Sequence, residues 1–315
     1  MAKKNKYKCS LFPYEREDFM SIQEVSQNAG WNISAFNLPE AWNMSQGEGI
    51  VIAVLDSGCD LDHPDLAENL LEGINLVSPG KPPEDDNGHG THVTGTIVAA
   101  NNDIGIVGVA PKAKVRPVKV LDGKGNGNLL NVAEGIRWAT KMGVDFISMS
   151  LGSPMPVQEV RKAIQFAASK GVVTFVAAGN AGNTKEVFYP AAYPETIAVG
   201  AVDIDMHRAK FSNTGKNLDF MAPGVDILST VPDDWYAKLS GTSMAQPFVC
   251  GVAALVKSYK KARNESDKLQ NVTDYINLFK KYTTPVVNGN YDDPHFYQGF
   301  GIIDPRKFFE SMKDH

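Results

Sequence analysis

The sequence predicts an α/β protein whose central sheet is mainly parallel and carries helices on both faces. Apolar, β-branched runs of strand length alternate along the chain with longer segments of helical periodicity. Runs that are apolar at every residue are typical of parallel strands buried on both faces. The predicted strands cover residues 50–55, 115–121, 146–149, 172–177 and 197–202.

Helices are predicted between and after these strands, over residues 129–141 and 157–170. The segment that starts at Gly241 is apolar almost all round, which is typical of a helix that passes through a core. Residues before about 30 and after about 267 are expected to be appendages, the latter with a helix-like stretch over 268–281. Ligand sites in such sheets lie at the carboxyl ends of the strands. Asp56, Ser150 and Asn180 all follow predicted strands.

Composition excludes several classes of protein. The chain has 315 residues, 43% hydrophobic and 21% charged, and a formal net charge of -5, as in ordinary soluble enzymes. Nothing basic suggests a nucleic-acid or membrane-surface partner, and we expect neither a secretory leader nor a membrane span. Cys9, Cys59 and Cys250 are odd in number and far apart, so reduced thiols in a cytoplasm are expected rather than disulfides or zinc.

Three short motifs occur in the order Asp, His, Ser. They are Asp56-Ser57-Gly58, Asn87-Gly88-His89-Gly90-Thr91-His92 and Gly241-Thr242-Ser243-Met244-Ala245. A serine hydroxyl is a poor nucleophile until a base takes its proton, and that base needs a carboxylate to orient it. Singly, Asp56 could be only a cap and Ser243 only a small core residue. His92 lacks the glutamate of a His-Glu-x-x-His zinc motif and is expected to be a structural, hydrogen-bonding residue.

In this order and setting the motifs resemble those of the subtilase family of serine proteases over roughly residues 38–304. The resemblance implies a three-layer subtilisin-like fold and an endopeptidase with Asp56, His89 and Ser243 as its catalytic triad. Asn180, in the run Ala177 to Asn180, is implied as the oxyanion donor. A catalytic domain over 31–304 would follow an inhibitory extension over 1–30 and precede a helical tail over 305–315.

The resemblance also implies a substrate cleft. The substrate main chain would add as a strand between residues 125–127 and 150–152, and an apolar pocket would take a residue several positions before the scissile bond. Phe188 stands where the family usually has a small residue at the base of the first specificity pocket, and its ring either shortens that pocket or packs in the core. The other implied substrate-binding residues are Gly125, Asn126, Gly127, Leu129, Ser150, Leu151, Gly152, Ala177, Ala178 and Gly179.

Calcium is the cofactor that the resemblance implies. The side chains of Asp65 and Asn102 match the family's tight structural site, with a further ligand expected from the N-terminal segment. A turn without metal is the alternative. The carbonyl ligands at this site would come from Ala100, Ile104 and Ile106. A weaker cation site would use Ala191, Tyr193, Thr196 and Asp219.

The N-terminal residues resemble those of the family's intracellular branch. Cys59 follows Asp56 as in that branch, and Leu11-Phe12-Pro13-Tyr14 is close to the Leu-Ile-Pro-Tyr element of its short extension. The alternatives are that Cys59 is only a small buried residue and that the tetrapeptide only anchors a tail. Pro13 is expected to carry the chain past Ser243 unattacked, which makes the tetrapeptide an inhibitory segment and the protein a zymogen. After Met244, Ala245-Gln246-Pro247-Phe248 replaces the family's Ala-x-Pro-His.

Two other functions compete with proteolysis. A non-catalytic peptide-binding module on the same fold would not need an intact triad. A dinucleotide-binding oxidoreductase is disfavoured, because no Gly-x-Gly-x-x-Gly follows the first strand. The expected partners are protein and peptide substrates, and a homodimer is left open.

Overall fold

The computed structural model describes residues 7–21, 27–182, 186–265, 269–287 and 292–313. Its main sheet has the strand order β14-β15-β11-β10-β9-β7-β3-β5-β4, and within the described residues only β14 and β15 pair antiparallel. The strands are β3 (Val51–Asp56), β4 (Ile74–Asn75), β5 (Lys114–Lys119), β7 (Phe146–Met149), β9 (Val173–Ala177), β10 (Ile197–Val202), β11 (Phe220–Pro223), β14 (Thr283–Thr284) and β15 (Ile302–Ile303).

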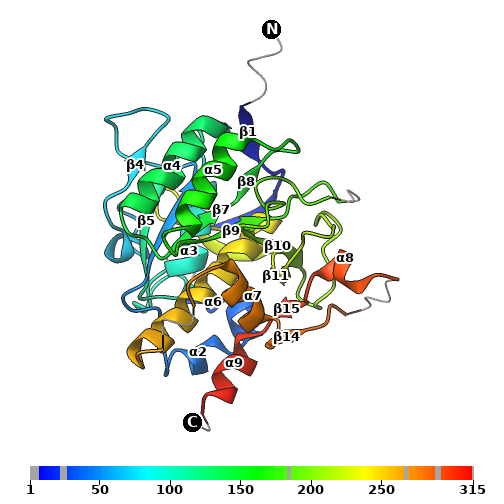
Figure 1. Cartoon of the computed structure of the whole chain (residues 1–315). Coiled ribbons are helices and arrows are strands. Elements are labelled where there is room, and N and C mark those ends of the chain that lie inside the picture. Colours follow the sequence, from blue (N-terminus) through cyan, green and yellow to red (C-terminus); the bar gives the residue numbers. More distant parts are fainter. Residues whose placement is uncertain (1–6, 22–26, 183–185, 266–268, 288–291, 314–315) are drawn as a thin grey trace.

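Helices cover both faces of this sheet (Figure 1). On one face lie α4 (Leu129–Lys141) and α5 (Gln158–Ala168), and on the other α3 (His89–Val98) and α6 (Thr242–Ala262). The three-layer α/β architecture predicted from the sequence is thus confirmed. The remaining helices are α1 (Trp31–Ser34), α2 (Leu38–Ala41), the 3-10 turn η1 (Ala67–Asn69), α7 (Val272–Phe279), α8 (Pro294–Gln298) and α9 (Pro305–Ser311).

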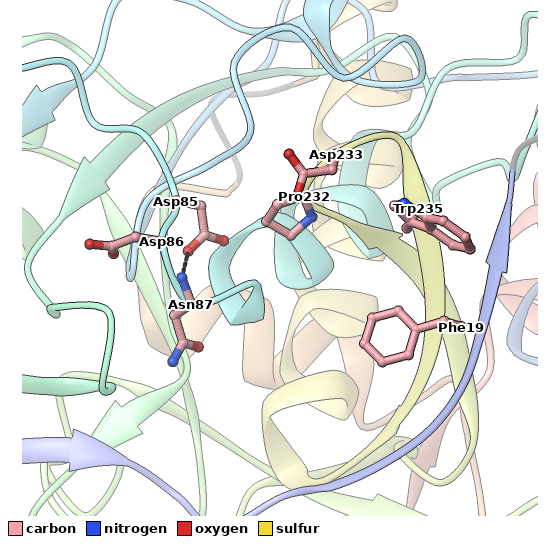
Figure 2. A pocket seen from close by; sticks show the side chains of 7 residues that line it. All are labelled: Phe19, Asp85, Asp86, Asn87, Pro232, Asp233 and Trp235. Carbon is pink, nitrogen blue, oxygen red and sulfur yellow. Dashed lines mark hydrogen bonds between the residues drawn. The ribbon is translucent and has the colours of Figure 1, made fainter.

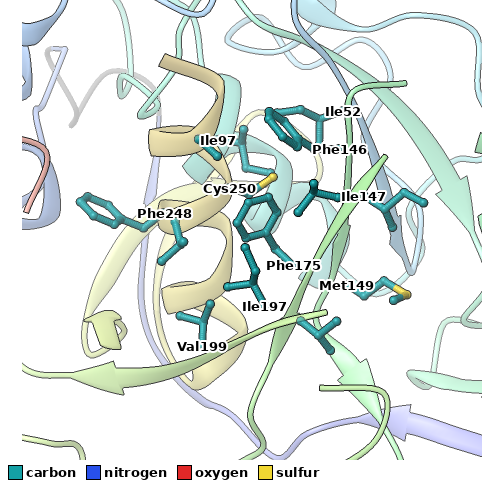
Figure 3. Close-up of a cluster of buried hydrophobic side chains, with 14 of the residues drawn as sticks. Ile52, Ile97, Phe146, Ile147, Met149, Phe175, Ile197, Val199, Phe248 and Cys250 are labelled. Carbon is teal, nitrogen blue, oxygen red and sulfur yellow. The ribbon is translucent and has the colours of Figure 1, made fainter. Parts of the chain in front are cut away.

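The core between the sheet and α6 explains why that helix is apolar all round. Phe248 and Cys250 of α6 are fully buried, and Figure 3 shows Cys250 beside Phe146 and Phe175 of the sheet. Tyr275 of α7 makes edge contacts with both of these rings at 5.5 and 6.5 Å. The prediction that the chain after about residue 267 is an appendage is therefore wrong, because α7, β14 and β15 complete the core and the main sheet.

The N-terminal residues add strands to two smaller sheets. Strand β1 (Lys8–Leu11) lies between β6 (Asn126–Asn128) and β8 (Leu151–Gly152) and is antiparallel to both. Strand β2 (Glu15–Ser21) pairs antiparallel with β13 (Trp235–Ser240), whose other neighbour is β12 (Ile227–Val231). The parts of the expected extension and tail at 1–6, 22–26 and 314–315 lie outside the described residues, as does Lys268, the first residue of the helix expected over 268–281.

Candidate active site

Three ends of secondary structure bring the predicted triad residues together. Asp56 is the last residue of β3, His89 opens α3, and Ser243 lies in the first turn of α6. The Nδ1 atom of His89 lies 2.8 Å from Oδ1 of Asp56, and both side chains are buried. The carboxylate therefore fixes the orientation of the ring and leaves Nε2 for other chemistry. Among the described residues this Nε2 atom has no hydrogen-bond partner.

The hydroxyl of Ser243 is held by the strand beside it. It donates to the carbonyl oxygen of Ser150 at 3.3 Å, and the Ser150 hydroxyl in turn lies 3.1 Å from the carbonyl oxygen of Ser243. Gln246 accepts hydrogen bonds from Ser150 and from Ser148 at 3.1 and 2.9 Å. Gln246, at the variable position of the Ala-x-Pro-His pattern that this chain leaves at Phe248, thus ties α6 to the sheet.

Asp85 supports the loop that carries His89, and sequence reasoning missed it. Its carboxylate accepts hydrogen bonds from the Ser57 hydroxyl, from Thr91 and from the backbone of Asn87 and Gly88. Burial alone would raise the pKa of Asp85, but these hydrogen bonds, led by that of Thr91, lower the pKa below its ordinary value. The residue sits in a run of three acidic residues, a pattern that gives no signal of a buried role.

Asn180 lies between α6 and the N-terminal segment. Its side-chain oxygen accepts from the backbone and hydroxyl of Thr242 at 2.9 and 2.7 Å, which fixes the direction of the amide. Its Nδ2 atom then donates to the carbonyl oxygen of Pro13 at 2.8 Å. The predicted oxyanion donor is therefore a fixed group that points at a backbone carbonyl.

The predicted substrate cleft holds the chain's own N-terminal segment. Ser10 pairs with both Asn126 and Gly152, and the backbone N–H of Leu11 donates to the carbonyl of Gly125 at 2.9 Å. Leu129 donates its backbone N–H to Tyr7 at 2.7 Å. Gly127 permits this close approach, because a Cβ there would lie 3.1 Å from the sulfur of Cys9.

Phe12 lies in the predicted first specificity pocket. It is only 4% exposed, and a Cβ on Gly152 would lie 2.6 Å from its ring. The ring of Phe188 stands 5.9 Å from that of Phe12 and is itself half-buried, so it contacts the occupant of the pocket and does not belong to the buried core. Ala178 accepts the backbone hydrogen bond of Phe188 at 3.0 Å, and Gly179 follows with φ +108. Ala177 ends β9, directly before this turn.

The predicted calcium residues gather at one loop. Oδ2 of Asp65 accepts from Tyr236 and from the N–H of Ile106, both at 2.9 Å, while Oδ1 is buried with no partner among the described residues. Burial raises the pKa of this carboxyl above its ordinary value. The Asn102 side chain lies over the same loop, where it bonds to the backbone of Pro64 and Ile104.

Gln27 is a side chain from the N-terminal segment that lies at this loop, and no residue could be assigned to that position from the sequence. Its amide donates to the Ala100 carbonyl and accepts from the N–H of Asp103, each at 3.1 Å. An unpartnered carboxylate oxygen among carbonyl and amide oxygens fits a hard cation such as Ca²⁺.

Two other places are less suited to a metal. The Thr196 hydroxyl donates to the carbonyls of Ala191 and Tyr193 at 3.1 and 2.9 Å, and Asp219 accepts from the N–H of Ala198 at 2.8 Å. Asp219 has no buried, unpartnered oxygen among the described residues of the kind that Asp65 has. Within the described residues, the side-chain ligand atoms of Asp203, Asp205 and His207 lie within 4.8 Å of one another. This group is at the surface, and Asp203 accepts from the backbone of both neighbours.

The remaining predictions concern histidine and cysteine. Nε2 of His92 lies 2.8 Å from the carbonyl of Ile227 and 3.1 Å from that of Ala237, which confirms its structural role. The three cysteines are free and buried in this structure. Among the described residues, none of the helices combines the length and apolar character that a bilayer crossing requires.

Comparison with known proteins agrees with this geometry. The chain is 44% identical over 290 residues to "Intracellular serine protease" of Paenibacillus polymyxa, covering 89% of this chain and 87% of that protein. It is 45% identical over 262 residues to "Major intracellular serine protease" of Bacillus subtilis (strain 168), covering 80% and 81%. It is 47% identical over 268 residues to "Subtilisin Savinase" of Lederbergia lenta, covering 84% and 98%. Residues 47–301 match the Subtilase family, and the chain therefore belongs to this family of serine endopeptidases.

Proposed function

We propose that the protein is an intracellular endopeptidase that uses Asp56, His89 and Ser243 as its catalytic triad and is made as a zymogen. The hydrogen bond between Asn180 and Pro13, with Phe12 in the first pocket, is the observation that carries this proposal. This arrangement supports the proposal because it is the one expected of a substrate-like strand whose backbone is displaced from the position that hydrolysis needs.

The catalytic roles follow from the chemistry of each group. His89, oriented by Asp56, takes the proton of the Ser243 hydroxyl as this oxygen attacks the substrate carbonyl carbon. Asn180 and backbone N–H groups at the start of α6 stabilise the negative charge on the carbonyl oxygen. The amine leaves with a proton from His89, and water then hydrolyses the acyl-enzyme by the same route. Before the attack, the Ser243 hydroxyl must turn away from the Ser150 carbonyl, to which it donates here, and toward Nε2 of His89.

The inhibitory role rests on a mismatch of one residue between two parts of the cleft. In a substrate, the residue whose side chain fills the first pocket also presents its carbonyl to the oxyanion donor. Here Phe12 fills the pocket, but the Asn180 side chain binds the carbonyl of Pro13. Pro13 has no N–H and a fixed φ, so the strand pairing of β1 ends before it. The ring of Tyr14, 5.1 Å from that of His89, lies against the proposed base.

Activation would require a cut between this segment and the body, within residues 15–28, by another copy of the enzyme. The extension acts through a tether, so its effective concentration at the cleft is high until it is cut. Once cut, the same residues must compete with substrate as a free peptide.

Calcium is proposed as a structural cofactor bound by Asp65, Asn102 and Gln27, with carbonyls of Ala100, Ile104 and Ile106. A bound Ca²⁺ would supply the positive charge that the buried Asp65 carboxylate lacks. Since it would join residues far apart in the sequence, it would stabilise the folded state. A weaker second site at Asp219 stays a prediction.

The cytoplasm is the proposed location, and exposed or unfolded protein segments are the proposed substrates. The names of two relatives contain the word intracellular, and the free, buried cysteines are compatible with that compartment. A homodimer stays a prediction.

Three forms of the protein test the zymogen: the full-length chain, the full-length Ser243→Ala variant and a chain that lacks residues 1–25. We expect the truncated form to cleave casein without a lag, and the full-length form to show a lag that shortens as enzyme concentration rises. Ser243→Ala should keep its intact N-terminus by mass spectrometry.

A full-length Pro13→Ala variant serves as the matched control, because it restores a backbone N–H without changing Phe12 or Tyr14. We expect its lag to be shorter than that of the wild type. Equal initial rates for the truncated and full-length forms, with the N-terminus shown to be intact, would rule the inhibitory role out.

A further inference from the structure

Strand β13 has one neighbour from the body and one from the extension. Its pairing with β2 runs from Ser240 opposite Glu15 to Trp235 opposite Ser21, with an irregularity between Ala237 and Lys238. If the extension leaves, β13 becomes the edge of its sheet and the backbone groups facing β2 lose their partners. An edge strand of this kind is a template for another extended chain.

The pairing begins at the active site. Tyr14 lies against His89, and the next residue, Glu15, is opposite Ser240, three residues before Ser243. The segment that continues from the first pocket toward its C-terminus therefore runs directly onto β13. A substrate with a side chain in the pocket of Phe12 would present the residues after its scissile bond to the same edge.

A cavity of about 490 Å³ opens beside the far end of β13 (Figure 2). Phe19 and Trp235 line it from the two paired strands, and Pro232 and Asp233 with the loop Asp85 to Asn87 complete it. Phe19 is opposite Ala237, so it is a diagonal neighbour of Trp235 on the same face of the sheet. Both rings are large and partly exposed, at 55% and 41%.

The exposure of Phe19 and Trp235 is expected of a cavity that binds the extension before activation and substrate afterwards. A permanent contact between Phe19 and Trp235 would be expected to bury both rings, whereas the cavity leaves room beside them. Phe19 comes from the segment that is removed, and Trp235 belongs to the body. After activation the body therefore retains Trp235 and Pro232 as the apolar part of the cavity wall, without their aromatic neighbour Phe19.

We propose that β13 forms an extended substrate site in the activated enzyme. It binds the residues that follow the scissile bond as an antiparallel strand, in the positions that Glu15–Ser21 occupy here. The cavity at Trp235 takes a large apolar side chain from the seventh residue after the scissile bond. Phe19 holds this position if Phe12 is counted as the last residue before the bond. The preferred substrate is thus an extended segment of polypeptide and not a short peptide. This inference rests on the proposed endopeptidase function.

Binding can be tested without catalysis, in the Ser243→Ala protein that lacks residues 1–25. The probes are two fluorescent peptides with the sequences of residues 7–14 and 7–21, both with Cys9→Ser. We expect the longer peptide to bind about tenfold more tightly, equivalent to about 1.4 kcal/mol. Phe19→Ala in the peptide should remove most of this gain. Equal dissociation constants for the two lengths would overturn the proposal.

Trp235→Ala in the protein gives the reciprocal test. It should remove the same gain for the longer peptide and leave binding of the shorter one unchanged, which also shows that the variant is folded. Val287→Ala, which shortens an exposed apolar side chain outside the cavity, is the matched control and should change neither constant. Loss of affinity for both peptides in Trp235→Ala, or for neither, would contradict the assignment.

Kinetics separate this inference from the proposed function. The truncated enzyme with Ser243 intact is given substrates that share one sequence before the scissile bond and carry two or eight residues after it. We expect kcat/KM to be about tenfold higher for the longer substrate with Phe at the seventh position than with Gly there. No cleavage of any substrate would sink the endopeptidase function. Cleavage that is independent of length and of the seventh residue would leave that function standing and sink only the extended site.

Discussion

The side-chain nitrogen of Asn180 lies 2.8 Å from the carbonyl oxygen of Pro13, although the side chain in the first pocket is that of the preceding residue, Phe12. The predicted first pocket and the proposed oxyanion donor thus hold different residues of one strand. In a productive complex both must act on the same residue. Variants at Ser243, Asn180, Asp65 and Phe188 separate the contributions of these groups in the activated form, which lacks residues 1–25, whereas Cys9 is followed in the full-length protein.

Replacing Ser243 by alanine should abolish peptide hydrolysis while the fold is retained, because no other nucleophile is proposed in the cleft. Activity on a peptide substrate and the melting temperature are the measurements. A fluorophosphonate should label the wild type but not this variant, and Ser169→Ala, an exposed serine outside the cleft, should keep the label. Hydrolysis close to the wild-type rate in Ser243→Ala would refute the triad, and an unlabelled wild type would favour a peptide-binding module.

Asn180→Ala should lower kcat much more than it changes KM, because the oxyanion exists chiefly in the transition state. The expected loss is about 10² to 10³ in kcat, a value borrowed from the corresponding donor of a subtilisin. Asn217→Ala, which removes an amide bonded to the Ala192 carbonyl outside the triad, is the control and should stay close to wild type. An unchanged kcat in Asn180→Ala would place the donor elsewhere.

Removal of calcium with a chelator should lower the melting temperature of the wild type, because an ion that binds only the folded state stabilises it by about 2.7 kcal/mol at a hundredfold excess over its Kd. Asp65→Asn keeps an acceptor for Tyr236 but loses the charge, so its melting temperature should no longer respond to the chelator. Asp203→Asn, in the surface cluster, should respond as the wild type does. If the chelator leaves the melting temperatures of both the wild type and Asp65→Asn unchanged, the Asp65 loop does not bind a metal.

Phe188→Gly should improve cleavage after large side chains, because its ring contacts the residue in the first pocket. The measurement is kcat/KM for a set of peptides that differ only at the residue before the scissile bond. Preferences at the other positions should not change and serve as the internal control. An unaltered profile would mean that the ring does not limit the pocket.

Cys9 should react slowly with an alkylating reagent as long as β1 stays in the cleft. Burial raises the pKa of its thiol to about 12, so in the full-length Ser243→Ala protein its reactivity should stay low between about pH 7 and about pH 9. A released thiol has an ordinary pKa of 9.0, and its reactivity rises over this range as the thiolate forms. Mass spectrometry of the labelled protein measures the rate.

The comparison is a Phe12→Ala variant, whose segment should leave the cleft more often. We expect Cys9 to be labelled faster there and with the pH dependence of a free thiol. Cys59 and Cys250 are fully buried and should stay unlabelled in both proteins. Rapid, pH-dependent labelling of Cys9 in the parent protein would show that β1 is not held in the cleft.

The sequence predicted those elements best whose burial is visible in a local pattern. The bounds of α4, β7 and β10 agree with the predictions, because strands that are apolar on both faces and a helix with a clear period need no distant information. In contrast, β1 and β2 were not predicted as strands. Their residues are mixed in polarity, and their partners lie more than a hundred positions away along the chain, which no local period encodes.

The candidate site shows the same division. Asp56, His89 and Ser243 stand in motifs at the ends of strong elements, so their meeting could be expected from the sequence. Gln27 reaches Ala100 across 73 positions through a single side chain, and a glutamine near a chain terminus carries no signal of its own. Asp85 likewise gains its role from five hydrogen bonds that form only in the folded loop.

The position of Gln27 sets a limit for anyone who designs a recombinant form of this protein. The strand β2 ends at Ser21, and only a few residues further on Gln27 is bonded to the loop of Ala100 and Asp103. The coding sequence for a form that lacks the inhibitory segment should therefore start after the codon for Ser21 and no later than the codon for Gln27. A start further downstream would remove a side chain that fastens this loop, and the product would be less robust in storage and in use.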